Sequence, residues 1–409
     1  MVFLYNTGIR LYLVLISLVS PFNKKAKLWL NGRKNWEAKL SAINNKNEKV
    51  VWFHCASLGE FEQGRPVIEA FKQKYSEIKI LLTFFSPSGY EIRKNYQGAD
   101  YIVYLPIDTK RNAKRFIDLV NPIAVVFVKY EFWFHYLNYL KSRKIPTYII
   151  SAIFRNDQVF FKSYGDWYRK FLNNFEHLFV QNENSQKLLQ GIGVNNVTVS
   201  GDTRFDRVIA NYNSTKQLPL LQQFSENSKV LIAGSSWPKD EELILEYFIS
   251  NQDKIKLILA PHEINRSNIE KVISKCNVKT ILYTKSDGVD PKEARLLIID
   301  TIGILSSAYR YGTVAYIGGG FGVGIHNTLE AAVFGLPILF GPNYKKFKEA
   351  TDLIALKAAF SVKTQEEFNH LADLLFTNQD SYATAQTKSR EYVNSNIGST
   401  DIIVKKINL

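Results

Sequence analysis

The sequence YIGGGFGVGIHNTLEAAVFGLPILFGP occupies residues 316–342 and carries the densest chemical pattern in the chain. Its apolar start predicts a strand that ends in a glycine-rich loop, and a helical pattern begins near His326 and Asn327. Glycines let backbone N–H groups approach a phosphate, and a helix N-terminus adds partial positive charge. Glu330, in the first turn of that helix, is suited to holding ribose hydroxyls. We therefore predict a nucleotide-phosphate site, whose loop glycines are Gly318, Gly319, Gly320 and Gly322.

This glycine loop matches neither of the two common phosphate-binding motifs. No Gly-Lys-Ser/Thr follows it, so it is not a Walker A loop. It lies late in the chain and lacks an acid about 20 residues further on at a second strand end, so it is not a dinucleotide fingerprint. The competing interpretation is a flexible glycine loop that merely ends a core strand.

Working outward from this loop, short apolar runs alternate with amphipathic helical patterns. Six runs in the first half predict strands, at 49–57, 78–86, 99–106, 122–129, 146–152 and 177–182. Six runs in the second half do the same, at 228–236, 255–262, 279–285, 294–300, 312–320 and 336–342. This alternation predicts an α/β fold with parallel sheets and right-handed crossovers. We expect two Rossmann-like domains with a ligand cleft between them, at the carboxyl ends of the strands.

Polar residues mark where these domains begin and end. Residues 211–227 are polar and lack a strong strand pattern, so they are the predicted linker. The first domain would then cover 24–210 and the second 228–409, with a last helix that could pack back on the first domain. Residues 1–23 stand apart from both.

The N-terminus combines an apolar segment with a basic one. Arg10 is the only charge in residues 1–23, and six bases against one acid, Glu37, follow between Lys24 and Lys39. A secretory signal would have its charge first and end at a small-residue cleavage site. The segment is marginal for crossing a bilayer, which needs about 20 residues. We predict an uncleaved membrane anchor that spans the bilayer or lies in its interface, and the alternative is a buried first helix of a soluble domain.

Composition limits the remaining possibilities. The 409 residues contain 52 Lys and Arg against 38 acids, a formal net charge of +14, which indicates an anionic partner such as nucleic acid, an acidic membrane or a phosphorylated substrate. The two cysteines, Cys55 and Cys276, exclude a disulfide scaffold and a cysteine zinc ribbon, and favour a reducing compartment. The six histidines lack the HxxxH and HExxH spacings of zinc hydrolases.

Three further segments carry groups that can do chemistry. Glu60 follows the first core strand at a glycine-assisted turn, where a carboxylate can act as general base, although an acid there can also simply complement the helix dipole. Lys129 and Glu131 close the strand at 122–129, and Arg204 closes the first half. For these the competing interpretation is a local Lys–Glu or Arg–Asp ion pair.

Taken together, these segments resemble the 3-deoxy-D-manno-octulosonic acid (Kdo) transferases of lipopolysaccharide synthesis. The matching stretches are HCASLGE (54–60), YEFW (130–133), SGDTRFD (200–206), GSSW (234–237), APH (260–262), DTIGIL (300–305) and GGGFGVGIHNTLEAAVFGLPILFGP (318–342). The resemblance implies membrane-associated glycosyltransferases of the GT-B fold, with an acceptor-binding first domain and a nucleotide-sugar-binding second domain. The HxxSxGE pattern combined with a downstream HNxxE pattern is its specific element.

The resemblance also implies roles for individual residues. Glu60 would be the catalytic base, and Glu131 and Arg204 would stabilise the transition state. The residues implied in binding CMP are Pro261, His262, Ile302, Gly303, Ile304, Asn327, Thr328, Leu329 and Glu330. Further candidates are Ser57, Gly59, Ser235, Ser236 and His326. The chain departs from the family pattern at Lys129, where an acid is usual, at Arg204, which replaces lysine, and at His262, which replaces arginine.

The activity implied is transfer of Kdo from CMP-Kdo to a lipid A precursor, lipid IVA, with inversion and with no metal or cofactor. The location implied is the cytoplasmic face of the inner membrane, with an anionic membrane surface as partner. One alternative is another GT-B enzyme that uses a UDP-sugar and a lipid acceptor. A basic nucleic-acid-binding protein and a membrane scaffold with a dead site are the non-enzymatic alternatives. Most aromatics lie within apolar patterns such as YEFWFHYLNYL (130–140), which argues against nucleic acid.

Overall fold

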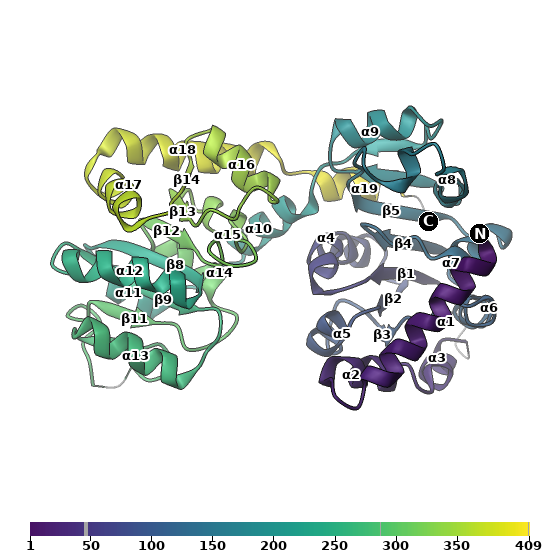
Figure 1. Cartoon of the computed structure of the whole chain (residues 1–409), viewed down its shortest axis with the longest axis horizontal. Coiled ribbons are helices and arrows are strands. Elements are labelled where there is room, and N and C mark those ends of the chain that lie inside the picture. Colours follow the sequence, from purple (N-terminus) through teal and green to yellow (C-terminus); the bar gives the residue numbers. More distant parts are fainter. Residues whose placement is uncertain (45–47, 287, 408) are drawn as a thin grey trace. The chain divides into compact units, whose positions relative to one another are not determined.

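The structure is a computed structural model that describes residues 1–44, 48–286, 288–407 and 409. The chain divides into two compact units, Met1–Arg207 with Ile397–Leu409, and Val208–Asn396. Each unit is built around one seven-stranded parallel β-sheet with helices packed around it (Figure 1). The predicted α/β class, with two Rossmann-like domains, is therefore confirmed.

The sheet of the first unit has the strand order β3-β2-β1-β4-β5-β6-β7. Its strands are β1 (Val50–Cys55), β2 (Lys79–Phe84), β3 (Tyr101–Tyr104), β4 (Ala124–Val128), β5 (Thr147–Ala152), β6 (His177–Val180) and β7 (Val197–Val199). Its helices are α1 (Val2–Val19), α2 (Lys24–Gly32), α3 (Trp36–Asn44), α4 (Leu58–Lys74), α5 (Pro87–Arg93), α6 (Lys110–Val120), α7 (Phe134–Ser142), the 3-10 helix η1 (Val159–Phe161), α8 (Asp166–Leu172), α9 (Glu183–Gln190) and α19 (Ser399–Lys406). The order reverses between β1 and β4, and sheets of this kind bind ligands at the carboxyl ends of the strands where the order reverses.

The sheet of the second unit has the order β10-β11-β9-β8-β12-β13-β14, which reverses between β8 and β12. Its strands are β8 (Lys229–Ser236), β9 (Ile255–Pro261), β10 (Thr280–Leu282), β11 (Leu296–Ile298), β12 (Val314–Ile317), β13 (Ile338–Phe340) and β14 (Ala359–Ser361). Its helices are α11 (Pro219–Ser225), α12 (Pro238–Asn251), α13 (Arg266–Cys276), α14 (Leu305–Ala308), the 3-10 helix η2 (Tyr309–Tyr311), α15 (Leu329–Ala332), α16 (Lys348–Ala355), α17 (Gln365–Thr377) and α18 (Gln379–Ser395), and α10 (Thr203–Asn213) crosses the division between the units. The two reversal points identify where each unit should hold its ligand.

The core of the first unit explains why β1 is a central strand. Every residue of its sequence VVWFHC is buried, as expected for a parallel strand covered on both faces. The Trp52 ring packs against Phe116, Phe127 and Tyr136, with centroid distances of 4.9, 5.4 and 5.7 Å. His54 is the polar exception in this strand, and it belongs to the site described below.

The structure differs from the predicted element boundaries in two places. The twelve predicted strands form, but β7 (VTV) and β14 (AFS) were not predicted, because a polar residue interrupts each of these short apolar runs. Residues 211–227, the predicted linker, contain the end of α10 and the helix α11, which buries Leu221 and Phe224 in the second unit. The two buried side chains lie in an otherwise polar stretch, so composition alone did not reveal the helix.

The C-terminus returns to the first unit rather than ending in the second. Residues 397–409 include α19, which packs against α4. The Asp206 carboxylate accepts the backbone N–H groups of Gly398 and Thr400, each at 2.6 Å, and fixes the start of this segment. The first unit therefore begins and ends the chain, and the last helix packs back on it, as the prediction for 228–409 allowed.

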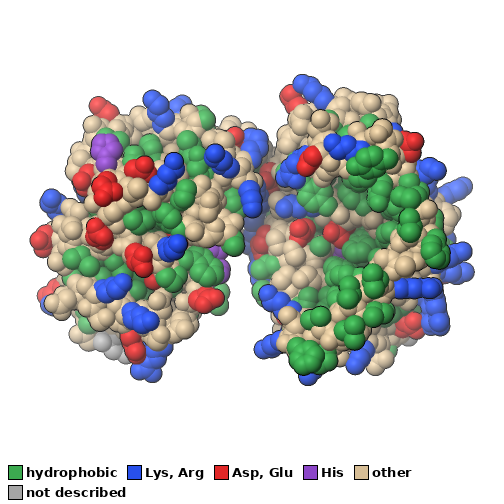
Figure 2. Space-filling model, viewed as in Figure 1, with side chains coloured by type: hydrophobic (Ala, Val, Ile, Leu, Met, Phe, Trp, Pro, Cys, Tyr) green, Lys and Arg blue, Asp and Glu red, His purple; other side chains and the backbone are tan. Residues whose placement is uncertain are grey.

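The N-terminal helix α1 packs along the outside of the first unit (Figure 1). None of its residues is buried, which contradicts the alternative of a buried first helix. By length and composition alone it could cross a membrane, with a mean hydropathy of 1.7. Hydrophobic side chains gather on the face of the first unit that Figure 2 shows, where Figure 1 places α1.

Candidate active site

Glu131 lies at the reversal point of the first sheet, just after β4, and is 8% exposed. Lys129 adopts a left-handed backbone conformation with φ 66°, which turns the chain sharply at the strand end. The Glu131 carboxylate is bonded by two ring systems: the His54 Nε2 lies 2.9 Å from Oε2, and the Trp133 Nε1 donates to the same oxygen at 2.6 Å. Among the described residues, the close contact of Glu131 is thus with His54 and not with Lys129.

A chain of buried hydrogen bonds orients the His54 ring. The Trp52 Nε1, which can only donate, bonds to the Thr83 hydroxyl oxygen at 2.7 Å. The Thr83 oxygen lies 2.8 Å from His54 Nδ1 and 3.4 Å from the Phe53 carbonyl oxygen. Because a carboxylate only accepts hydrogen bonds, the contact with Glu131 requires a proton on His54 Nε2, which donates it. The carboxylate is held in one position by groups on two strands, β1 and β2, and on the loop after β4.

Glu60 lies in the first turn of α4, immediately after β1, and its carboxylate accepts a hydrogen bond from the Ser57 hydroxyl. A Cβ at Gly59 would contact only the Ser57 side chain, so the turn is open there. Glu62, two residues on, is instead paired with Arg93 at 2.7 Å. The described residues give Glu60 no ion-pair partner, and its half-exposed carboxylate is the one at this strand end free to accept a proton.

Arg204 forms the local ion pair that the sequence left open. Its Nε and Nη2 lie 2.8 and 2.7 Å from the Asp202 Oδ2. The start of α10 is tied to α4, because the Thr203 hydroxyl donates to the Gln63 carbonyl at 2.6 Å. Arg204 therefore sits beside the helix that carries Glu60, with its charge partly met by Asp202.

The glycine loop of the second unit is organised by Asp240, which the sequence analysis missed. This fully buried carboxylate accepts from the Tyr316 hydroxyl (2.8 Å), the Gly319 N–H (2.8 Å) and the Trp237 N–H (2.9 Å). The N–H groups of Gly318, Gly322 and Gly324 donate to backbone carbonyls. Most of the loop N–H groups are therefore already bonded within the protein, and phosphate binding by this loop stays a prediction.

The loop glycines are needed for close backbone packing instead. A Cβ on Gly318 would lie 2.1 Å from the Ser235 carbonyl oxygen, and one on Gly320 would lie 2.5 Å from the Gly341 nitrogen. The helix that follows also differs from the prediction: α15 begins at Leu329, later than expected, and has four residues. The loop thus joins the ends of β8, β12 and β13 tightly.

Three aromatic rings form a continuous stack at the carboxyl ends of β8 and β9. His262, which follows Pro261 at the end of β9, lies 4.5 Å from the Trp237 ring and 4.6 Å from the His326 ring. The Trp237 Nε1 donates to His326 Nε2 at 3.3 Å. Burial and the neighbouring His262 lower the pKa of His326, so its ring is neutral near pH 7. The stack offers flat surfaces and a polar edge.

The remaining predicted residues of the second unit lie in the 302–304 loop, at the end of β8 and around the start of α15. Ile302 is 91% exposed and Gly303 has a φ of 97°, so the 302–304 loop presents backbone ahead of α14. The Asn327 side chain accepts the Leu329 N–H and donates to Glu330 Oε1, each at 3.1 Å, and so orients that carboxylate. Thr328 and Leu329 are fully buried, and the Ser236 hydroxyl is engaged by Glu241 at 3.0 Å. The roles of all these residues stay predictions.

Sequence reasoning missed four residues that orient the groups at the strand ends. His54, Trp133 and Asp202 do so in the first unit, and Asp240 does so in the second. His54 was visible as the first letter of the HxxSxGE pattern, and Trp133 as the end of YEFW. Asp240 had only a weak signal, an acid in the first turn of a helix. Among the described residues, no group of three or more His, Cys, Asp or Glu side chains is placed to hold a metal ion.

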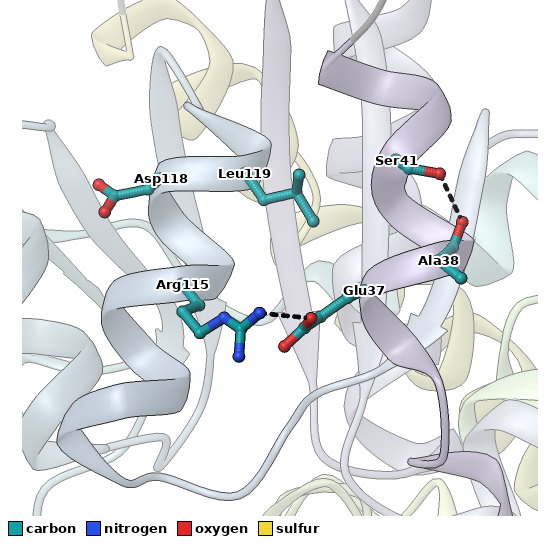
Figure 3. A pocket seen from close by; sticks show the side chains of 6 residues that line it. All are labelled: Glu37, Ala38, Ser41, Arg115, Asp118 and Leu119. Atoms are coloured by element: carbon teal, nitrogen blue, oxygen red, sulfur yellow. Dashed lines mark hydrogen bonds and ion pairs between the residues drawn. The ribbon is translucent and has the colours of Figure 1, made fainter.

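A pocket between α3 and α6 is not part of either strand end (Figure 3). It measures about 540 Å³ and is lined by Glu37, Ala38, Ser41, Arg115, Asp118 and Leu119. Arg115 donates to Glu37 at 2.7 Å, and the Ser41 hydroxyl donates to the Ala38 carbonyl at the same distance. Its polar groups are engaged with one another, so we place no reaction there.

Comparisons with known proteins show what the chain is similar to. Residues 34–207 match the family model described as 3-deoxy-D-manno-octulosonic-acid transferase (kdotransferase). A 3-deoxy-D-manno-octulosonic acid transferase of Aquifex aeolicus is 28% identical over 351 residues, covering 84% of this chain and 90% of the relative. One of Rickettsia bellii is 26% identical, covering 86% and 85%. The structure of UDP-GlcNAc 2-epimerase from Neisseria meningitidis bound to UDP-GlcNAc superposes with a TM-score of 0.62, at 18% identity, over 87% of this chain and 98% of that chain.

The structural neighbour shows the fold alone, whereas the two sequence relatives match this chain over most of its length. The family match covers most of the first unit, which carries Glu60, Glu131 and Arg204. The chain is therefore similar to the Kdo transferases, and its two units have the GT-B fold.

Proposed function

We propose that this protein transfers Kdo from CMP-Kdo to a lipid A precursor, lipid IVA, with inversion at the anomeric carbon. The reaction would belong to lipopolysaccharide synthesis at the cytoplasmic face of the inner membrane. The proposal is supported by relatives that are named as Kdo transferases and that this chain matches over most of their length. It is also supported by the apolar α1 followed by the exposed Lys24, Lys25 and Lys27, which suit an anionic membrane surface.

The observation that carries the proposal is the contrast between two carboxylates at one strand reversal. Glu131 is buried and accepts from His54 and Trp133, so it acts as a fixed negative charge. Glu60 accepts one hydrogen bond, from Ser57, and keeps capacity to take a proton. A general base and a fixed charge are what attack by a sugar hydroxyl requires.

In the proposed step, the acceptor hydroxyl oxygen attacks the anomeric carbon of Kdo while the bond to the CMP phosphate breaks. The electron pair of that bond leaves with CMP, and the hydroxyl proton passes to Glu60. Positive charge develops on the sugar ring, where the fixed Glu131 charge is favourable. Arg204 would meet negative charge on the phosphate, and loss of one such donor typically costs about 10²–10³ in rate.

The second unit supplies groups that suit a cytidine nucleotide. The ring stack of Trp237, His262 and His326 offers an apolar face, and Glu330, oriented by Asn327, can accept from ribose hydroxyls. Because the glycine N–H groups are bonded internally, the phosphate must be met by other donors of the protein. The proposed reaction uses neither a metal nor a cofactor.

Donor preference tests the proposal directly. Purified full-length protein is incubated with a tetra-acylated lipid A precursor and either CMP-Kdo or a panel of UDP-sugars, and additions are counted by mass spectrometry. Transfer from CMP-Kdo supports the proposal. Transfer from a UDP-sugar alone supports the other GT-B enzyme and refutes it.

A further inference from the structure

An apolar pocket of about 320 Å³ lies between α1 and the first sheet. Its lining residues are Ile9, Tyr12, Phe85, Ile107, Asp108 and Trp133. Two of them belong to α1, and the others lie just after β2, β3 and β4, at the carboxyl ends of those strands. Figure 1 shows α1 crossing these strands. The volume is at the low end of the range for ligand sites, roughly 300–1,000 Å³.

The pocket exists because α1 is docked and not detached. The Tyr5 hydroxyl donates to Asp108 Oδ2 at 2.5 Å, and Asn6 Oδ1 lies 2.6 Å from His135 Nε2. One turn or two further on, the Tyr12 ring packs against Phe85 at 6.2 Å. Residues 5, 6, 9 and 12 share one helix face, so α1 is held along its length by the protein.

The opposite face of α1 is also apolar, and no part of the described protein covers it. Its exposed side chains include Phe3, Leu4, Leu11, Val14, Leu15 and Leu18. A helix with one face on the protein and an apolar face outward suits a membrane interface better than a span that leaves the body. The mouth of the pocket is thereby placed at the level of lipid acyl chains.

The pocket shares its walls with the candidate reaction site. The Trp133 ring lines it, and the Nε1 of the same ring donates to Glu131. Phe85 lines it too, and the N–H groups of Phe85 and Ser86 donate to the Ala56 carbonyl at 3.2 and 2.7 Å, next to the Ser57–Glu60 turn. The Trp133 side chain therefore joins the pocket to Glu131, and Phe85 is bonded next to the turn that carries Glu60.

The charged group in the lining does not oppose an apolar ligand. Both Asp108 oxygens are engaged, Oδ2 by Tyr5 and the His135 N–H, and Oδ1 by the Tyr136 N–H at 3.1 Å. A ligand in the pocket would therefore contact mainly the aromatic and aliphatic side chains of the lining.

We propose that this pocket binds one acyl chain of the lipid acceptor, so that α1 forms a wall of the acceptor site. The inference rests on the proposed function, since it assumes an acylated acceptor. It goes beyond it by assigning the N-terminal helix a role in substrate binding as well as in attachment to the membrane.

A pair of tryptophan substitutions on α1 tests the pocket. Ile9→Trp places an indole in the pocket, and Thr7→Trp places one on the exposed face as a control. With full-length protein and CMP-Kdo, the KM for a series of monomeric short-chain acceptors should fall roughly fourfold per added methylene in the wild type. Ile9→Trp should flatten this series, whereas Thr7→Trp should retain it. Both variants should keep the wild-type KM for CMP-Kdo.

Equal chain-length dependence in Ile9→Trp and the wild type would overturn the pocket assignment while leaving Kdo transfer intact. A wild type that transfers nothing from CMP-Kdo would instead refute the proposed function.

A cross-linking experiment reads the pocket without turnover. An acceptor analogue with a photoreactive group at its acyl end should label Tyr12 and Ile107 in full-length protein, and excess unlabelled acceptor should compete. Labelling confined to the exposed side chains Leu11, Leu15 and Leu18, or competition by bulk phospholipid alone, would show only contact with the membrane and refute the pocket.

Discussion

The two sheets reverse their strand order in the same way, but the reversal points hold different chemistry. In the first unit, β1 and β4 end in two carboxylates, of which Glu131 is fixed by His54 and Glu60 is lightly held. In the second unit, β8 and β12 end in a ring stack and a glycine loop tied down by Asp240. The same topology thus presents carboxylates in one unit and an aromatic stack in the other, and the proposed function assigns proton transfer to the first and nucleotide binding to the second.

The largest effect should come from the lightly held carboxylate of the first unit. Glu60→Gln keeps the size of the side chain but removes the proton acceptor, so turnover should fall by about 10²–10⁴. CMP binding, which depends on the second unit, should be unchanged when measured by calorimetry. Glu62→Gln is the matched control, because its loss of an ion pair with Arg93 should change turnover only a few-fold. Near-normal turnover in Glu60→Gln would break the assignment of the base.

Removing α1 tests whether this helix of the first unit attaches the protein to the membrane. Deletion of residues 2–22 should move at least nine-tenths of the protein from the membrane pellet to the supernatant, roughly a tenfold change or more in partitioning. Replacing Lys24, Lys25 and Lys27 with Gln should weaken binding less and make it less salt-sensitive, since each base contributes about 1 kcal/mol near an anionic surface. Unchanged partitioning of the deletion variant would contradict the anchor.

The second unit should depend on Asp240 for stability more than for chemistry. Asp240→Ala leaves the Tyr316 hydroxyl and two backbone N–H groups without their acceptor, at a cost of roughly 3 kcal/mol in the free energy of unfolding. CMP affinity should fall with it, because Trp237 and Gly319 lose their anchor. Glu242→Ala, on the exposed side of the same helix, should change stability by about 0.5 kcal/mol or less. Denaturant unfolding of both variants, followed with and without CMP, makes the comparison.

The sequence predicted the elements and motifs of both units but not how the motifs are bonded. Alternating apolar runs predicted the strands, because strands buried on both faces are continuously apolar. Glu60 and Glu131 could be placed at strand ends for the same reason. The His54–Glu131 contact joins residues 77 positions apart, and the Asp240–Gly319 bond joins residues 79 apart, so neither could be predicted without the register of the sheets. The glycine loop was predicted to bind phosphate because the sequence does not show that most of its N–H groups donate to acceptors within the protein.

The smallest effect concerns pH and the docking of α1 on the first unit. Burial raises the pKa of Asp108 to about 6, above the value of about 3.9 in an unfolded chain. The folded state therefore holds the proton more tightly, so this contribution to stability is fully present below pH 4 and is lost as pH rises through about 6. Between pH 5 and 7 the loss amounts to roughly 1 kcal/mol.

Asp108→Asn should remove this part of the pH dependence, because an amide does not titrate, while its oxygen can still accept from Tyr5. The measurement is the unfolding temperature of the first unit at pH 5 and pH 7, where the wild type should lose about 2–4 °C more than the variant. Glu77→Gln, at an exposed acid of the same unit, should behave as the wild type. If Asp108→Asn and the wild type show the same difference between the two pH values, the Asp108 carboxyl does not control the docking of α1. The second unit should show no change in either variant, because Asp108 and its hydrogen-bond partners all lie in the first.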